Sequence, residues 1–182
     1  AKYHHYDLSS LLVADPDLLT RYAEAYYATF YLAPHNYHRV HMPFDGQLMR
    51  TVYVPGWLYS VHPKTIAKRP SIYAKNERLI CDFDTEHGPM VVIMIGACLV
   101  GSMSTRWGKR YQPMGRRKPQ HEDFSGSPLR LAKGEELGRF HYGSSVMILL
   151  PKSFQSQFHP HATLQACKMG ESLGAFTQES HS

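Results

Sequence analysis

The chain has 182 residues, of which 43% are hydrophobic and 19% are charged, so its composition excludes an intrinsically disordered protein and predicts one globular domain with a core. The longest apolar run, 90–100, is about half of the ~20 residues that a helix needs to cross a bilayer, so we expect no membrane-spanning segment. The formal net charge of +5 favours an anionic partner, either a phospholipid surface or a nucleic acid, without choosing between them.

The first part of the chain predicts two short helices. Apolar side chains recur at helical spacing from Pro16 to Ala28, with Asp15 placed to cap the helix and Pro16 suited to its first turn. An earlier helical turn is expected from Asp7 to Val13.

After Phe30 the sequence predicts mainly β-strands. Runs rich in β-branched and aromatic residues are separated by Pro and Gly, and they cover residues 30–33, 48–54, 78–83, 90–100 and 145–150. The run 90–100 has no polar alternation, which predicts a strand buried on both faces. Residues 102–126 are basic and irregular in sequence, which predicts a surface loop. These patterns together favour a predominantly β fold with helices at its start.

Two histidines, His38 and His41, lie three residues apart between Pro34 and Pro43, and the prolines disfavour a long helix there. A metal site would need a third ligand at a suitable spacing, and the segment has no HExxH pattern and no cysteine partner, so we expect no metal. The residues alone leave two interpretations open. The histidines are structural, or they transfer protons, because imidazole titrates near neutral pH.

A second candidate is Gly143-Ser144-Ser145, which runs into the apolar strand 146–150. Taken alone, a Gly-Ser-Ser before a strand is typical of a turn. No GxSxG pattern surrounds it, so the nucleophile elbow of an α/β-hydrolase is not supported.

Several short motifs precede this serine in a fixed order. They read Tyr-Leu-Ala-Pro (31–34), Tyr-His-Arg-Val-His-Met-Pro (37–43), Tyr-Ala-Lys-Asn-Glu-Arg (73–78), Phe-Asp-Thr-Glu (83–86), Gly-Pro-Met (88–90), Gly-Ala (96–97), Val-Gly-Ser (100–102) and Lys-Gly-Glu-Glu-Leu-Gly-Arg-Phe (133–140). In order and spacing, from about Ala1 to Leu150, the chain resembles the pyruvoyl-dependent phosphatidylserine decarboxylases. The match corresponds to about the C-terminal two-thirds of a proenzyme of that family.

The resemblance implies a fold and a maturation reaction. The fold would be α+β and predominantly β, with antiparallel sheets forming a sandwich or barrel-like core and a few flanking helices, in a single domain over 1–182. Ser144 Oγ would attack the Gly143 carbonyl while His41 takes the proton, and a glycine suits that bond because it has no Cβ to obstruct the approach. Cleavage would give residues 1–143 and 144–182, with Ser144 converted to a covalent pyruvoyl group as the cofactor and no external cofactor required.

The resemblance also implies a substrate. Phosphatidylserine would be decarboxylated to phosphatidylethanolamine, with the pyruvoyl group withdrawing electrons as pyridoxal phosphate does elsewhere and His38 returning the proton. The partners would be phosphatidylserine and an anionic membrane surface, contacted by the basic segment from Arg106 to Lys118, and the location would be peripheral, on the cytoplasmic face of a membrane. We expect no nucleic-acid partner, and the sequence leaves open whether copies assemble into a homo-oligomer.

The chain departs from the family pattern at two places. Tyr142-Gly143-Ser144-Ser145 stands where the family has Leu-Gly-Ser-Thr. The family orients its base histidine with the aspartate of a Pro-x-Asp-Gly segment that has no counterpart here, and Asp45-Gly46 matches a different family position. Two alternatives therefore stay open: a family decarboxylase acting on another amino acid or head group, and a lipid-binding form that does not mature.

Overall fold

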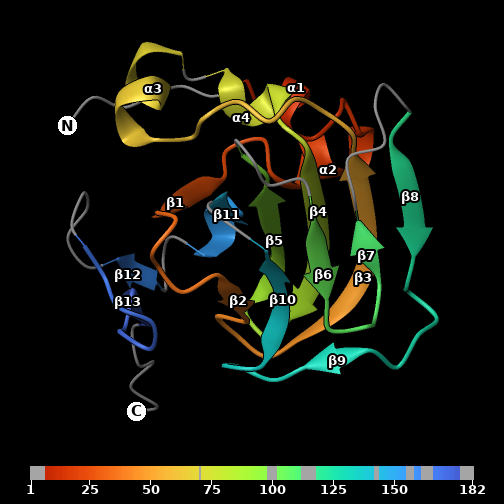
Figure 1. Ribbon diagram of the computed structural model, residues 1–182. Helices are drawn as coiled ribbons and strands as arrows, with labels where there is room; N and C mark the ends of the chain where they lie inside the picture. The colour runs from red at the N-terminus through yellow and green to blue at the C-terminus, as the bar shows by residue number, and fades with distance from the viewer. Residues whose placement is uncertain are drawn as a thin grey trace.

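The computed structural model describes residues 7–69, 71–97, 102–111, 118–141, 144–154, 158–160 and 166–176. Antiparallel sheets are the main regular structure of the described residues, and Figure 1 shows them beneath a group of short helices. The strands are β1 (Tyr26–Leu32), β2 (Arg39–His41), β3 (Gly46–Val54), β4 (Arg78–Thr85), β5 (Gly88–Ile95), β6 (Met103–Thr105), β7 (Arg110–Tyr111), β8 (Gln120–Asp123), β9 (Arg130–Leu131), β10 (Glu136–Phe140), β11 (Ser144–Leu150), β12 (Phe158–Pro160) and β13 (Gly174–Phe176). The helices are α1 (Leu8–Leu11), α2 (Pro16–Arg21), α3 (Pro63–Lys68) and α4 (Ile72–Lys75), with a 3₁₀ turn at Lys152–Phe154.

The larger sheet has the strand order β1-β11-β5-β4-β3-β8, with β9 pairing to the other end of β3. A smaller sheet has the order β2-β10-β6-β7, and β12 pairs with β13. All of these pairs are antiparallel. The predicted antiparallel, predominantly β fold is therefore confirmed, and its core is a sandwich.

The larger sheet is buried on both faces, as β5 shows most clearly. Met90, Val92 and Met94 face the smaller sheet and pack against residues such as Leu137 and Phe140 of β10. The alternate residues of β5 face the helices and pack with Leu18 and Ile66, among others: Val91, Ile93 and Ile95. A strand buried on both faces needs no polar alternation, so the interpretation of the apolar run is confirmed for 90–95. Residues 98–100 lie outside the described residues.

The helices at the start of the chain form largely as predicted. Asp7 and Asp15 cap α1 and α2 with their side-chain oxygens, and Pro16 occupies the first turn of α2. The prediction that the second helix extends to Ala28 is wrong, because α2 ends at Arg21 and Tyr26 already belongs to β1. Tyr26 to Leu32 pair with β11, and these pairings outweigh the local helical spacing.

The prediction of an irregular loop over 102–126 is also wrong for the described part of that segment. It contributes β6 and β7 to the smaller sheet and β8 to the edge of the larger one. These strands are two to four residues long, so they carry little periodicity that a sequence pattern could reveal. Among the described residues, no helix is long and apolar enough to cross a bilayer.

Candidate functional site

Ser144 is the first residue of β11, a strand with neighbours on both sides in the larger sheet. It pairs with Leu32 of β1, and its side chain is fully buried. Its Oγ has no hydrogen-bond partner within the described part of the chain. Burying a hydroxyl without a partner costs about 1–3 kcal/mol, so an unpaired buried hydroxyl calls for an explanation outside stability. Gly143 and Tyr142, the other residues of the predicted cleavage motif, lie outside the described residues.

His38 lies at the same junction between the two sheets as Ser144. The connection from β1 to β2 begins after Leu32, the partner of Ser144, and it ends where the His38 carbonyl accepts a hydrogen bond from Phe140 N–H at 2.9 Å. Phe140 ends β10, only three residues before the predicted bond. The connection from β1 to β2 thus runs from the partner of Ser144 to the partner of Phe140. It places the backbone of His38 beside the strand that precedes the predicted cleavage motif.

The His38 ring carries a defined tautomer. Nε2 lies 3.1 Å from the Pro34 carbonyl oxygen, and because a carbonyl only accepts, Nε2 carries the hydrogen. In the neutral ring Nδ1 then holds the lone pair, and this atom is buried without a hydrogen-bond partner in the described chain. The turn before it is closed by Asn36, whose Oδ1 accepts from Ala33 N–H at 2.7 Å. His38 therefore presents an unoccupied proton acceptor.

His41 lies on β2 and is held through both ring nitrogens. Nδ1 donates to the Gly134 carbonyl at 2.7 Å, and Nε2 accepts from the Tyr37 hydroxyl at 2.7 Å. The Tyr37 ring stacks on the imidazole, with centroids 5.6 Å apart. The Gly134 carbonyl fixes the tautomer in which Nε2 is the basic nitrogen. A backbone carbonyl thus sets the orientation of this ring.

Asp45 supports this arrangement from a distance. Its Oδ1 accepts from Lys133 N–H at 2.6 Å, and Gly134 N–H donates to the Met42 carbonyl at 2.9 Å. Gly134 has φ +84°, a left-handed conformation that favours glycine. Asp45 therefore stabilises the turn whose carbonyl binds His41, and it acts on the ring only through that turn.

A buried polar group that the sequence analysis did not single out lies behind Ser145. The Tyr73 hydroxyl lies beside the Ser145 hydroxyl, and burial raises the pKa of Tyr73. Glu77, which belongs to the same Tyr-Ala-Lys-Asn-Glu-Arg motif as Tyr73, is fully buried beside Tyr53. Burial raises the pKa of the Glu77 carboxyl to about 7. The only sequence signal for these groups was their place in the Tyr-Ala-Lys-Asn-Glu-Arg motif.

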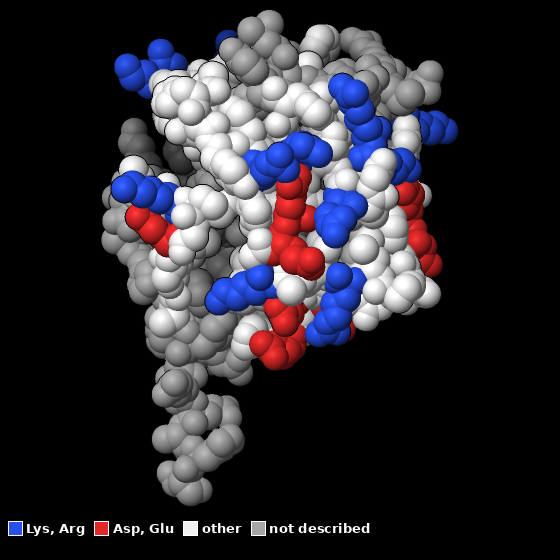
Figure 2. Space-filling model, turned by 60° about the horizontal axis from the view of Figure 1, so that its bottom comes forward, with Lys and Arg blue, Asp and Glu red and all other residues white. Residues whose placement is uncertain are grey.

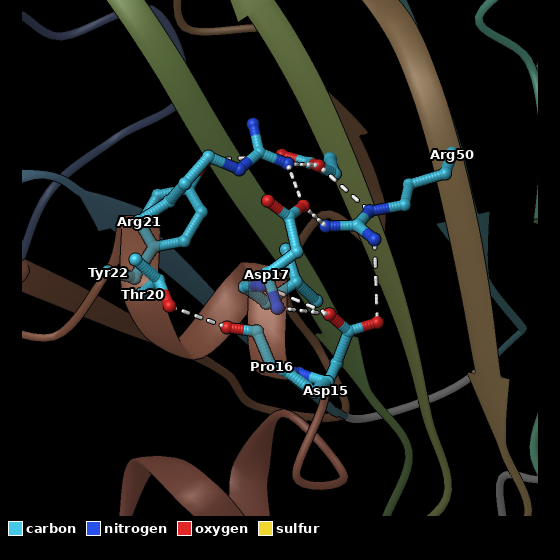
Figure 3. A network of polar contacts seen from close by, with 9 residues as sticks. Asp15, Pro16, Asp17, Thr20, Arg21, Tyr22 and Arg50 are labelled. Atoms are coloured by element: carbon cyan, nitrogen blue, oxygen red, sulfur yellow. Dashed lines mark hydrogen bonds and ion pairs between the residues drawn. The ribbon is translucent and has the colours of Figure 1, made fainter.

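A second polar cluster, shown in Figure 3, tethers α2 to the larger sheet. Arg21 of α2 and Arg50 of β3 both form ion pairs with the buried carboxylate of Asp82, and the Tyr22 hydroxyl donates to it at 3.2 Å. Arg50 also contacts Asp17 and, at 3.4 Å, Asp15. Two guanidinium groups thus contact three carboxylates, and Asp82 is on β4, two strands from β11. This cluster is structural.

The structure brings the backbone of His38 to the end of β10 that precedes Ser144, whereas His41 pairs with Glu136 at the other end of β10. A buried serine with a histidine of defined tautomer nearby is a candidate enzyme site. Comparison with known proteins gives the family of the chain: the phosphatidylserine decarboxylase model matches residues 1–175. The chain is 41% identical over 174 residues to the phosphatidylserine decarboxylase proenzyme of Methylobacillus flagellatus, an alignment that covers 95% of the chain and 62% of the relative. It is 42% identical over 180 residues to the proenzyme of Alcanivorax borkumensis, with 98% and 62% covered. The chain therefore belongs to the phosphatidylserine decarboxylase family, and it spans less than two thirds of the length of these relatives.

Proposed function

We propose that the chain carries the catalytic site of a phosphatidylserine decarboxylase that matures by cutting its own Gly143–Ser144 bond. The observation that carries this proposal is the state of Ser144, which is fully buried and whose Oγ has no hydrogen-bond partner in the described chain. Membership of a decarboxylase family whose relatives are named proenzymes supports it.

In the proposed maturation, Ser144 Oγ forms a bond to the Gly143 carbonyl carbon as the amide C–N bond breaks, giving an ester and a free amine on residue 144. A hydroxyl needs a base to act as a nucleophile, and His41 Nε2 is the candidate because Gly134 holds the hydrogen on Nδ1. The Tyr37 hydroxyl must leave Nε2 before the serine proton can reach it. Loss of the Cα proton and of the Gly143 carboxylate from Cβ, followed by hydration and release of ammonia, converts residue 144 to a pyruvoyl group.

The buried position at the start of β11 suits a pyruvoyl group. Conversion of Ser144 to this group removes the buried hydroxyl that has no hydrogen-bond partner in the described chain. When present, a pyruvoyl group supplies the electron sink for loss of CO₂ from an amino acid amine. His38 is the proposed proton donor to the product: its Nδ1 would first take up a proton and then return it, and its backbone is fixed to Phe140 at this junction. The burial of Ser144 keeps its hydroxyl out of contact with bulk water.

The proposed substrate is phosphatidylserine and the product phosphatidylethanolamine. Because the substrate is a membrane lipid, we place the protein peripherally at the surface of an anionic membrane, on its cytoplasmic face. The amine and carboxylate of the serine head group would have to reach residue 144, while the acyl chains stay in the bilayer.

The test is self-cleavage of the purified chain, followed on a denaturing gel and by mass spectrometry of the fragment 144–182. We expect that fragment to begin with a pyruvoyl group, and Ser144→Ala to leave the chain whole. Ser145→Ala is the matched control, because it removes a neighbouring buried hydroxyl and should leave the cleaved bond unchanged. A fragment beginning with a free serine would mean ordinary proteolysis and would refute the mechanism.

The substrate is tested separately, by CO₂ release from the matured chain. We expect release with phosphatidylserine and none with free aromatic amino acids, and the opposite result would favour a decarboxylase of another substrate. A folded chain that never cleaves would leave the family membership standing and would identify a lipid-binding form that does not mature.

A further inference from the structure

The connection between β3 and α3 carries two large aromatic side chains on the protein surface. Trp57 is 55% exposed and Tyr59 is 42% exposed, and their rings stack with centroids 5.7 Å apart. Tryptophan side chains are mostly buried in folded proteins, so a pair of exposed, stacked aromatic rings indicates a surface that binds a membrane or another molecule.

This aromatic pair is held rigidly. Trp57 N–H donates to the Lys75 carbonyl, and the buried Asn76 side chain bonds both the N–H and the carbonyl of Tyr59, at 3.1 and 2.8 Å. Asn76 also donates to the Gly96 carbonyl at the end of β5. At Gly56 an added Cβ would lie 2.5 Å from the Lys75 carbonyl oxygen, so the backbones are in close contact there. The backbone that carries both rings is therefore already ordered, so binding costs little conformational entropy for that backbone.

The same segment is basic. From 55 to 76 the sequence has no Asp or Glu, and its four cations are all exposed: Lys64, Lys68, Arg69 and Lys75. None of them forms an ion pair with another described residue. Figure 1 shows α3 and α4, which carry or adjoin these residues, side by side at the top of the molecule.

Another face of the molecule mixes both signs of charge, although Arg106, Arg110 and Lys118 of the predicted basic segment also form no ion pair with a described residue. Figure 2 shows a face on which acidic side chains lie between basic ones. In the smaller sheet Arg39 and Arg139 both contact Glu136, and Lys109 of the predicted basic segment forms an ion pair with Glu122. Paired cations attract an anionic surface less than unpaired ones do.

The aromatic and basic surface also lies next to the candidate site. The ring of Tyr31 meets the ring of His62, the N-cap of α3, edge to face at 5.7 Å. Tyr31 pairs with Ser145 of β11, and Tyr73 of α4 lies beside the Ser145 hydroxyl. Two contacts thus connect this surface to the residue that follows Ser144.

From this geometry we infer that Trp57, Tyr59 and the four cations form the surface that docks on an anionic lipid bilayer, with the rings at the level of the head groups. Tryptophan and tyrosine favour the membrane interface because their rings have an apolar body and a polar edge. Lysine and arginine near an anionic leaflet each strengthen binding by about fivefold at physiological salt. The inference rests on the proposed function, since a lipid substrate gives the docking its purpose.

The experiment uses the whole 182-residue chain and vesicles of phosphatidylglycerol and phosphatidylcholine. These vesicles contain no phosphatidylserine, so binding does not depend on the catalytic site. The chain has only two tryptophans, Trp57 and Trp107, and Trp107 packs against Phe124. In Trp107→Phe the emission of Trp57 should shift to the blue on adding vesicles and be quenched by brominated acyl chains. In Trp57→Phe the emission of Trp107 should not change, and a change confined to Trp107 would overturn the inference.

The charge is tested with two quadruple Gln variants of equal net charge. Replacing Lys64, Lys68, Arg69 and Lys75 should weaken vesicle binding by about a hundredfold or more, given about fivefold per cation. Replacing Arg106, Arg110, Lys118 and Arg130, which are exposed on other elements, should weaken it by less than about tenfold. Equal losses in both variants, or a larger loss in the second, would overturn the inference and favour the predicted basic segment.

Binding by Ser144→Ala separates this inference from the proposed function. That variant cannot mature, so it should still bind vesicles through Trp57 if the docking surface is correct. Absence of binding by a folded chain that matures normally would refute the docking surface alone. Binding without maturation in the unaltered chain would refute the proposed function alone.

Discussion

Glu77 is a buried carboxyl whose ionisation should contribute to the pH dependence of stability. It is 0% exposed, its N–H donates to the Trp57 carbonyl, and its carbonyl accepts from Gly96 N–H. Burial raises the pKa of Glu77 from 4.5 to about 7. The folded chain therefore retains the proton where the unfolded chain has lost it, so the stabilisation is fully present below about pH 4.5 and is lost as pH rises through about 7.

The magnitude follows from the two pKa values. At about 1.36 kcal/mol per pKa unit, ionising Glu77 in the folded state costs about 3 kcal/mol, of which about 2.5 kcal/mol develops between pH 5 and pH 8. Glu77→Gln keeps the shape and cannot ionise. Its advantage in Tm over the unaltered chain should grow by about 5–10 °C between these pH values, since about 1 kcal/mol shifts the Tm of a domain of this size by about 2–4 °C.

The assay is thermal unfolding followed by circular dichroism at pH 5, 6, 7 and 8. The control is Glu86→Gln, because that side chain is 72% exposed and its replacement should change Tm by much less than the replacement of Glu77 at each pH. A difference between Glu77→Gln and the unaltered chain that is the same at pH 5 and pH 8 would refute the reasoning. It would mean that the carboxyl is ionised in the fold throughout.

Three further predictions concern the charge cluster and His41. Asp82→Asn should lower the free energy of unfolding, measured in urea, by about 3 kcal/mol. This is the lower end of the range for a buried ion pair, because the side chains of Arg21 and Arg50 are 33% and 25% exposed. Asp17→Asn, at a side chain that is 61% exposed, should cost less than about 1 kcal/mol. Tyr37→Phe should speed self-cleavage by about two- to tenfold on a timed gel, because it removes the hydrogen bond that occupies His41 Nε2, and slower cleavage would contradict a competing role. Added acetate should leave the cleavage rate unchanged, because the Gly134 carbonyl already occupies Nδ1, and acceleration by acetate would show that this position is open.

Much of the fold could be predicted because the controlling signal was local. The capping of α2 by Asp15 and the unbroken apolar run of β5 follow from side chains within a few residues of each other. The start of β1 at Tyr26 could not be predicted in this way. The partner of Tyr26 in the sheet, Leu150, is far along the chain. The helical spacing of the apolar residues from Pro16 to Ala28 predicted a helix at Tyr26 instead of a strand.

In the candidate site, too, the features with a local sequence signal could be predicted and those that depend on distant residues could not. Ser144, His38 and His41 could be found from ordered motifs, because a motif preserves residue types and spacing. The tautomer of His41 could not, since it depends on a backbone carbonyl at Gly134, which any residue supplies and no sequence pattern marks. The roles of the two histidines stay predictions, and the structure adds the hydrogen-bond partners that would let each ring act.

The carbonyl at Gly134 also bears on how fast the chain could mature. A carboxylate beside a base histidine does two things: it fixes the tautomer, and it stabilises the imidazolium that forms when the proton arrives. A carbonyl does the first and, being neutral, does little of the second. Losing both functions in a serine-histidine triad costs about 10⁴-fold in rate. Because the Gly134 carbonyl fixes the tautomer of His41, a carboxylate that reached this ring should speed maturation by less than that factor, and it should act on the charged transition state rather than on the orientation of the ring.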